Sequence, residues 1–227
     1  MSQFTFLLAA GLAGAFLWLL RLNLMAARTR KAARAGYFSA AAGLFQDVVL
    51  RVEPTGFARM AGTWAGARFD LQAVPDTLTF RKLPALWVMV TLTEAVPVGT
   101  ELHIMARPTQ TEVFSHFGLM PVAVALPAGF PDDCALRCED AAGLPPLTLI
   151  SGLAALFADE RVKELVISPK GVRLVVLAEE AERGAYLLFR DAEMGRVPFA
   201  AARLLPHLDV LRQLRDDLRA GMEKNDV

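Results

Sequence analysis

Residues 4–20 read FTFLLAAGLAGAFLWLL, a run without one charged side chain. At about 1.5 Å per residue, a helix of this length spans roughly 25 Å, and membrane-spanning helices begin at about 17 residues. Leu22, Leu24 and Met25 extend the apolar character past Arg21. That arginine can reach the lipid headgroups while its stem stays in apolar surroundings. The run predicts a transmembrane helix, so the rest of the chain is expected to form a soluble domain beside the membrane.

Two other interpretations of this run are weaker. A cleaved secretory signal has positive charge before its apolar stretch, whereas residues 1–3 are Met-Ser-Gln and the basic residues come afterwards. An interfacial amphipathic helix is apolar on one face only, and this run is apolar all round. We therefore expect a spanning helix.

The basic residues near the run predict its orientation. Positive residues close to a span mark its cytoplasmic side, so the N-terminus should face outward and residues 37–227 inward. The same residues should lie on anionic lipid. A composition rich in alanine and arginine is typical of bacterial proteins and so favours an inner membrane. The basic residues that carry these predictions are Arg21, Arg28, Arg30, Lys31 and Arg34.

Some small residues in the run, such as Ala10 and Gly14, are four positions apart. Such spacing lets two helices approach and self-associate, although alanine and glycine are also common in single spans. The C-terminal helix is a second candidate for self-association or partner binding. Its leucines at 204, 211 and 218 fit either a short coiled coil or packing on the chain's own sheet, and packing is favoured.

Charge excludes one class of partner. The chain has 24 basic and 24 acidic residues, and residues 1–36 hold five of the basic ones and none of the acidic ones. The remaining 19 basic and 24 acidic residues give the rest of the chain a net charge of −5. Nucleic-acid binding needs a basic patch or stripe, so we expect no nucleic-acid partner.

Alternating apolar residues indicate an antiparallel meander of five or six strands between residues 50 and 106. Leu78 and Phe80 belong to one of these strands, and the strongest alternation is at residues 86–93. Further on, residues 165–177 read as a hairpin and residues 186–190 as a strand. Helices are expected at residues 37–46, 147–158 and 199–222, with a short one opened by the capping pair Thr109 and Glu112.

The predicted fold class is therefore α+β: a transmembrane helix followed by antiparallel β-hairpins with two to three helices. A proline-rich stretch, residues 121–147, suggests a boundary. We divide the chain into an anchor at 1–36, a β-rich region at 37–142, and a region at 143–227 with a helix, a hairpin and the C-terminal helix. The two β-rich parts could be related, because Pro54 and Gly56 match Pro169 and Gly171, and a Gly-Ala pair follows each hairpin at residues 66–67 and 184–185. Good turn chemistry alone explains the same match.

No motif for phosphate binding, nucleophilic catalysis or zinc proteolysis is present. His103, on the polar face of its strand, is expected at the surface, as are the scattered His116 and His207. Cys134 and Cys138 are too far apart on a strand to form a disulfide and too few to form a structural zinc site. We expect a solvated acidic loop in which the two cysteines are buried, and we expect no catalytic, metal or cofactor site. The acidic residues beside them are Asp132, Asp133, Glu139 and Asp140.

Two functions fit these observations. The favoured one is a non-enzymatic accessory protein whose cytoplasmic domain binds another protein at the membrane. The alternative is an enzyme acting at the membrane face, with His103, His116 or the Cys134 region in its site. A polar-lined pocket holding one of these residues would favour the enzyme, and an exposed apolar patch would favour the binding protein.

Overall fold

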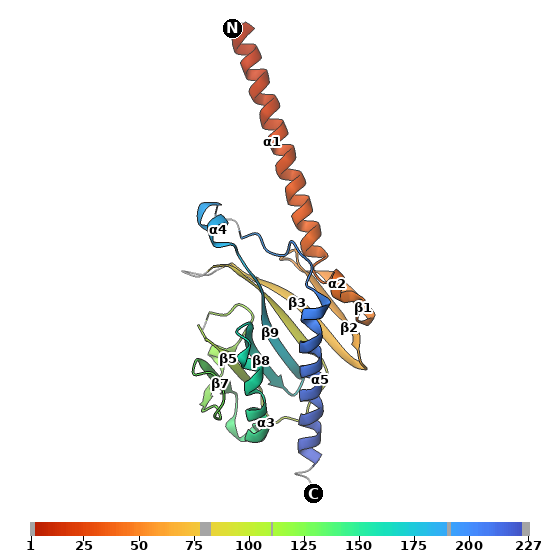
Figure 1. The fold of residues 1–227 in the computed structure, drawn as a ribbon, viewed down its shortest axis with the longest axis vertical. Coiled ribbons are helices and arrows are strands. Elements are labelled where there is room, and N and C mark those ends of the chain that lie inside the picture. Colours follow the sequence, from red (N-terminus) through yellow and green to blue (C-terminus); the bar gives the residue numbers. More distant parts are fainter. Residues whose placement is uncertain (1–2, 78–82, 110, 190–191, 224–227) are drawn as a thin grey trace.

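A computed structural model describes residues 3–77, 83–109, 111–189 and 192–223. One long helix, α1, stands out from a folded domain that contains all the other elements (Figure 1). The helices are α1 (Gln3–Ala35), α2 (Ser39–Ala42), α3 (Leu147–Gly152), α4 (Arg183–Phe189) and α5 (Ala201–Glu223). The strands are β1 (Gln46–Val52), β2 (Ala58–Trp64), β3 (Ala67–Asp76), β4 (Ala85–Leu92), β5 (Leu102–Ala106), β6 (Val122–Val124), β7 (Cys134–Cys138), β8 (Val162–Ser168) and β9 (Gly171–Glu180).

These strands form one antiparallel sheet in the order β1-β2-β3-β4-β9-β8-β5-β7-β6. The predicted α+β class is confirmed, and β1 to β4 are a meander as expected. The meander does not continue into β5, because the β8–β9 hairpin pairs between β4 and β5. Both predicted regions, 37–142 and 143–227, contribute strands to this sheet, and the division after residue 142 stays a prediction.

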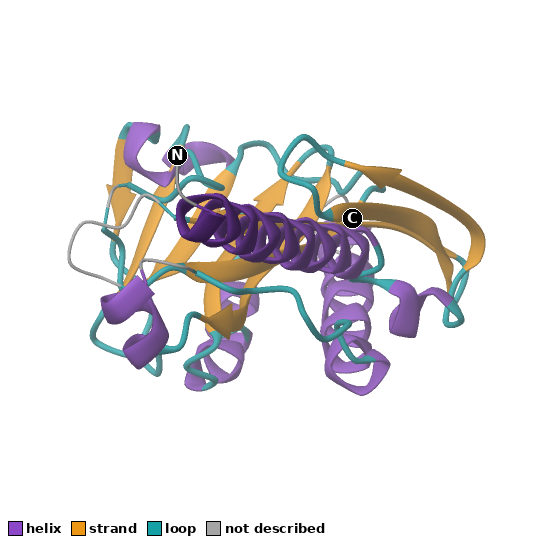
Figure 2. Cartoon of the chain, turned by 90° about the horizontal axis from the view of Figure 1, so that it is seen from above, coloured by secondary structure: helices purple, strands orange, loops and turns teal. Residues whose placement is uncertain are grey.

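Alternation along the strands gives the sheet two unlike faces, since successive side chains point to opposite sides. The side that we call the helix face carries the main core and is covered by α5, whose Leu204, Leu208 and Leu211 are fully buried. Figure 2 shows the helices gathered mainly along this side of the sheet. The leucine repeat of the C-terminal helix therefore packs on the chain's own sheet, as favoured. Pro206 lies inside α5.

Three local predictions are wrong. Residues 186–190 were expected to be a strand, yet α4 covers residues 183–189, so the second Gly-Ala pair opens no strand as the first does. The capping pair at Thr109 opens a turn rather than a helix, and only Phe117–Leu119 form a short 3-10 turn. Cys134 and Cys138 lie in a strand, β7, rather than in a loop.

Other local predictions are confirmed or lie outside the described residues. The hairpin at 165–177 is formed by β8 and β9, and Ser168 pairs with Gly171 across a two-residue turn. The helix expected at 147–158 is α3 followed by a 3-10 segment, Ala154–Ala158. The proline-rich stretch holds the short strands β6 and β7. The strand expected around Leu78 and Phe80 falls in residues 78–82, outside the described part.

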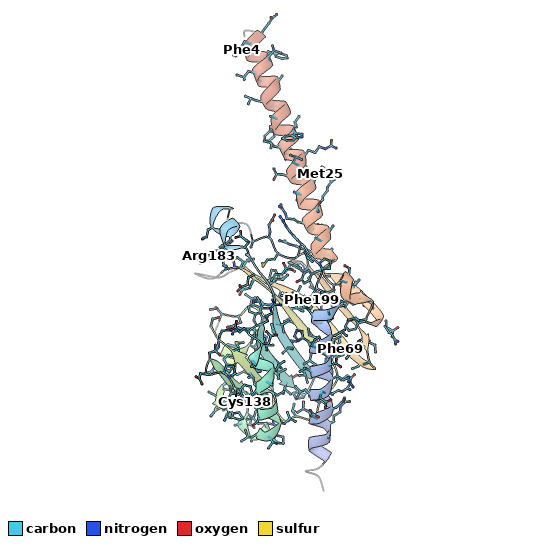
Figure 3. All side chains as sticks on the ribbon, viewed as in Figure 1. Phe4, Met25, Phe69, Cys138, Arg183 and Phe199 are labelled. Atoms are coloured by element: carbon cyan, nitrogen blue, oxygen red, sulfur yellow. The ribbon has the colours of Figure 1, made fainter. Side chains whose placement is uncertain are left out.

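In the described part of the chain, one N-terminal helix is long and apolar enough to cross a membrane. Its most apolar stretch makes no buried contact with the rest of the protein. Figure 3 shows the side chains of Phe4 and Met25 standing away from the folded domain. Helix α1 is therefore attached to the domain only at its C-terminal end.

Candidate functional site

A loop, residues 107–121, covers part of the second side of the sheet, which we call the loop face. His103, on β5, pairs with Val166 on β8, and their neighbours Met105 and Glu164 also stand opposite each other. Directly paired residues share a face, so all four side chains point to this side. Met105, Val166 and both polar residues are buried there. The loop closes over a buried polar cluster on this face.

His103 and Glu164 form the centre of that cluster. Nδ1 of His103 lies 2.8 Å from Oε1 of Glu164, and its Nε2 lies 2.9 Å from Oε1 of Glu101. The hydroxyl of Ser115, in the loop, also donates to Oε1 of Glu164, and Oγ of Ser115 accepts the backbone N–H of Phe117 at 3.0 Å. The cluster thus links two strands to the loop above them.

Burial and charge act in opposite directions on His103. Burial alone would lower its pKa, but the hydrogen bonds and charges of Glu164 and Glu101 outweigh burial and hold the pKa above its ordinary value. The protonated imidazole can then donate from both ring nitrogens, one to each carboxylate. His103 was expected at the surface because it lies on the polar face of its strand. That expectation is wrong because the loop covers this face and leaves only 3% of the residue exposed.

A second buried pair fastens the start of the same loop. Lys163 is the extra residue of a β-bulge in β8. Its Nζ donates to the carbonyl oxygens of Ala106 and Arg107, at 2.9 and 2.6 Å, and lies 3.1 Å from Oε1 of Glu112. The same carboxylate oxygen accepts the backbone N–H and the hydroxyl of Thr109. The capping pair Thr109 and Glu112 therefore does form a contact, but it closes a turn over Lys163.

Electrostatics keep Glu112 ionised in this position. Its partial burial would raise the pKa, yet the hydrogen bonds from Thr109 and the Lys163 ammonium lower it below the ordinary value. The ring of Phe114 then packs on Trp87 of β4, with ring centroids 5.2 Å apart. Contacts of Glu112, Phe114 and Ser115 hold the middle of the loop against the sheet.

A groove of about 1200 Å³ runs beside this loop, along the ends of β4, β8 and β9. Its wall contains Trp87 and Phe114 together with charged residues of both signs. None of the described residues that line the groove is a histidine or a cysteine, and Asp133 is the residue of the Cys134 region that reaches it. The charged side chains that line it are Asp76, Glu112, Asp133, Glu160, Glu179, Glu180, Arg107, Arg161 and Lys163.

The other candidate residues are scattered. His116 is exposed at the start of the 3-10 turn, and His207 is half-buried on α5, where burial lowers its pKa. Cys138 is buried and Cys134 partly so, and burial raises the pKa of both thiols, which disfavours the nucleophilic thiolate form. Among the described residues, no three His, Cys, Asp or Glu side chains are grouped as metal ligands.

The joint between α1 and the domain is built from buried aromatic rings. Tyr37 and Phe38 follow α1 after a single residue, Gly36, and both are buried. The Tyr37 ring packs edge-on against Phe57, with centroids 5.6 Å apart, and its carbonyl accepts the N–H of Phe199 at 2.7 Å. The phenol of Tyr37 donates to Oε1 of Glu179 at 3.0 Å. Phe199 therefore lies where the helix meets the domain, as Figure 3 shows.

Two basic residues after the span contact this joint as well. The Arg34 guanidinium lies 5.3 Å from the centre of the Phe57 ring, and Arg30 pairs with Glu193 at 3.3 Å. The end of α1 and the residues that follow it are thus joined to the domain by ring packing, a backbone hydrogen bond and an ion pair.

Sequence reasoning missed Lys163 and Glu164. Both stand at the start of the apolar stretch VKELVIS, residues 162–168. Two adjacent charges within a buried strand are the signal that could have found them, since buried charges are retained only with partners.

The comparisons with known proteins leave this geometry to be interpreted by itself: no protein-family model matches the chain, and no curated protein matches its sequence.

Proposed function

We propose that this chain is a single-pass membrane protein whose domain lies on the cytoplasmic side and binds another protein there, without catalysis. One observation carries the proposal: α1 has an apolar stretch long enough to cross a membrane, and that stretch makes no buried contact with the rest of the protein. Water is a poor solvent for such a helix. A membrane is the surrounding that this surface fits.

The charges beside the span support the cytoplasmic orientation. All five basic residues of residues 1–36 follow the apolar run, and none precedes it. A bacterial inner membrane fits this pattern, with the predicted lipid contacts made by Arg28, Arg30, Lys31 and Arg34. Arg30 and Arg34 also contact the domain, so in this proposal Arg28 and Lys31 are the residues best placed for headgroups.

The polar sites support a binding role rather than catalysis. A general base has to reach a substrate, and His103 is sealed under the loop. In the groove, Lys163 and Glu112 are already bound to each other and to backbone groups of the loop. These groups fasten the loop, and their chemistry is used within the chain.

Protease accessibility tests the orientation. A C-terminal tag should be protected in intact spheroplasts and digested after lysis, and an N-terminal tag should show the opposite pattern. Digestion of the C-terminal tag in intact spheroplasts would reverse the orientation and refute the cytoplasmic assignment.

A substitution tests the anchor itself. Leu12→Arg places a charge in the middle of the apolar run, at a cost of about 2.5–3.5 kcal/mol for insertion, and should move the chain out of the membrane fraction. Val197→Arg is the matched control, because Val197 is exposed on the domain and its substitution should leave fractionation unchanged. Equal behaviour of the two variants would show that α1 is not the anchor.

A further inference from the structure

The two edges of the sheet differ in how they are protected. β6, at one edge, has three residues, and prolines at 121 and 127 flank it. β1, at the other edge, has seven residues and contains no proline, and among the described strands it pairs with β2 alone. An edge strand presents a row of unpaired backbone N–H and C=O groups, which proteins usually shorten, bend or cover. β1 is the open edge of this sheet.

Apolar side chains line the open edge on both faces. Val49 is 46% exposed, Leu50 54% and Val52 57%. Leu50 and Val52 pair with the buried Met60 and Ala58 of β2, so they extend the apolar helix face past the point where the helices stop covering it. The core thus continues onto a strand that nothing in the described part of the chain covers on its outer side.

The start of β1 limits how much of the strand can pair. The register with β2 shifts between Gln46 and Val49, and Asp47 adopts a positive φ of 51°. A bulge of this kind bends an edge strand away from further pairing. The regular, open segment is therefore Val49 to Val52.

A charge on the loop face of this segment has no partner of opposite sign. Arg51 stands directly opposite Arg59 of β2, and like charges placed this way repel each other. Arg59 is neutralised by Asp70, which accepts from its Nε at 2.9 and 3.0 Å, and its Nη1 also lies 4.0 Å from Oε1 of Glu53. Arg51 makes no hydrogen bond or ion pair with any described residue. Both neighbouring carboxylates thus contact Arg59, and Arg51 is the unpaired charge of this segment.

We propose that an extended strand of a partner protein adds to β1, with apolar side chains against Leu50 and Val52 and a carboxylate beside Arg51. Backbone hydrogen bonds to the open edge would supply affinity, and the alternating side chains would supply specificity. This inference rests on the proposed function and names the surface and the partner chemistry for it. The partner segment is a peptide in which apolar and acidic residues alternate.

A second copy of the chain does not fit this edge. Antiparallel pairing of two β1 strands relates the copies by a twofold axis normal to the sheet. Helix α1 extends away from the folded domain (Figure 1), and the rotation reverses any part of its direction that lies in the plane of the sheet. Such a reversal does not suit two helices anchored in one membrane, which favours a partner strand from another protein.

Two synthetic peptides test the proposal on the full chain in detergent micelles. One alternates valine with glutamate and the other alternates valine with lysine, and both carry a fluorophore for anisotropy. We expect the glutamate peptide to bind about fivefold more tightly, because each cross-strand charge pair changes from attractive to repulsive in the lysine peptide. Hydrogen exchange should slow at residues 49–52 when the glutamate peptide is bound.

Charge reversal separates docking from general adhesion. Arg51→Glu should reverse the preference between the two peptides. Arg68→Glu is the matched control, because Arg68 is exposed on the same face of β3, away from the edge, and should keep the wild-type preference. The proposal is overturned if neither peptide binds, if Arg51→Glu leaves the preference unchanged, if Arg68→Glu alters it equally, or if the slowed amides lie elsewhere.

This test is independent of the orientation test. Peptide binding at β1 together with a failed protease test would keep the docking edge and refute the cytoplasmic location. No peptide binding together with a successful protease test would refute the docking edge alone.

Discussion

Replacing His103 by leucine should destabilise the domain by about 3–5 kcal/mol, because the substitution leaves a buried carboxylate without its charged partner. The magnitude follows from the surroundings of Glu164, which is 0% exposed. Its Oε1 accepts from His103 and from Ser115, and its Oε2 is buried without a hydrogen-bond partner among the described groups. After the substitution, the hydroxyl of Ser115 would be the remaining donor. Folded domains are stable by only about 5–15 kcal/mol, so the loss should be large.

Guanidinium unfolding of the full chain in detergent micelles, followed by tryptophan fluorescence, measures this loss. Trp87 is a suitable reporter because it packs on Phe114, in the loop that the cluster holds. The control is the double variant His103→Leu with Glu164→Leu. Replacing both members of a buried pair by apolar groups is often neutral or even stabilising, so the double variant should recover at least half of the loss.

Two results would contradict this reasoning. A loss below about 1 kcal/mol in His103→Leu would mean that Glu164 takes up a proton or reaches water at little cost, since neutralisation is the usual escape of an unpaired buried charge. A double variant as unstable as the single one would mean that the imidazole stabilises the domain by its shape rather than by its charge.

Three further predictions follow from buried groups. The pKa of folded His103 is raised above its ordinary value of about 6.5. Its contribution to the free energy of unfolding is therefore fully present below about pH 6.5 and is lost as the pH rises through the folded pKa. A pH series of unfolding curves should show this fall in stability, and His103→Gln should make the fall smaller. Phe38→Ala should lower the free energy of unfolding by about 3–5 kcal/mol and increase proteolysis after α1, because Phe38 is fully buried at the joint. Leu119→Ala is the control, because Leu119 is exposed and its substitution should change neither stability nor proteolysis. Gly171→Ala should lower the free energy of unfolding by more than about 2 kcal/mol, because φ is 147° and a Cβ there would collide with the carbonyl oxygen of Leu92. The control is Gly56→Ala, where φ is 84° but a Cβ would meet no other atom, and it should cost about 1–2 kcal/mol.

The features that the sequence predicted correctly are those with a local cause. The apolar run of α1, the alternation in β4 and the leucine spacing of α5 each indicate a helix or a strand within one continuous segment. The β8–β9 hairpin also has a local cause, because Pro169 and Gly171 set its turn. Patterns of this kind depend on which side of an element faces apolar surroundings, so they can be read without knowing the fold.

The failures come from contacts made over long distances in sequence. Residues 186–190 have the composition of a short strand, but the sheet edge beside them is taken, since β9 pairs with β4 and β8. A strand without a pairing partner is unstable, and α4 satisfies its backbone groups internally. The position of β5 depends in the same way on pairing with β8, which lies some sixty residues further along the chain. No pattern within either segment contains that information.

His103 illustrates the limit for functional sites. Its own strand correctly places it on the face opposite Leu102 and Ile104. Whether that face is wet or buried depends on the loop at 107–121, and the loop is held there by Lys163 and Glu164 of another strand. Burial of one polar residue is thus decided by the partners of a different segment. The same argument applies to β1. The sequence of its exposed valines and leucine resembles that of an interior strand, so its position at the open edge is known only once the strand order is known.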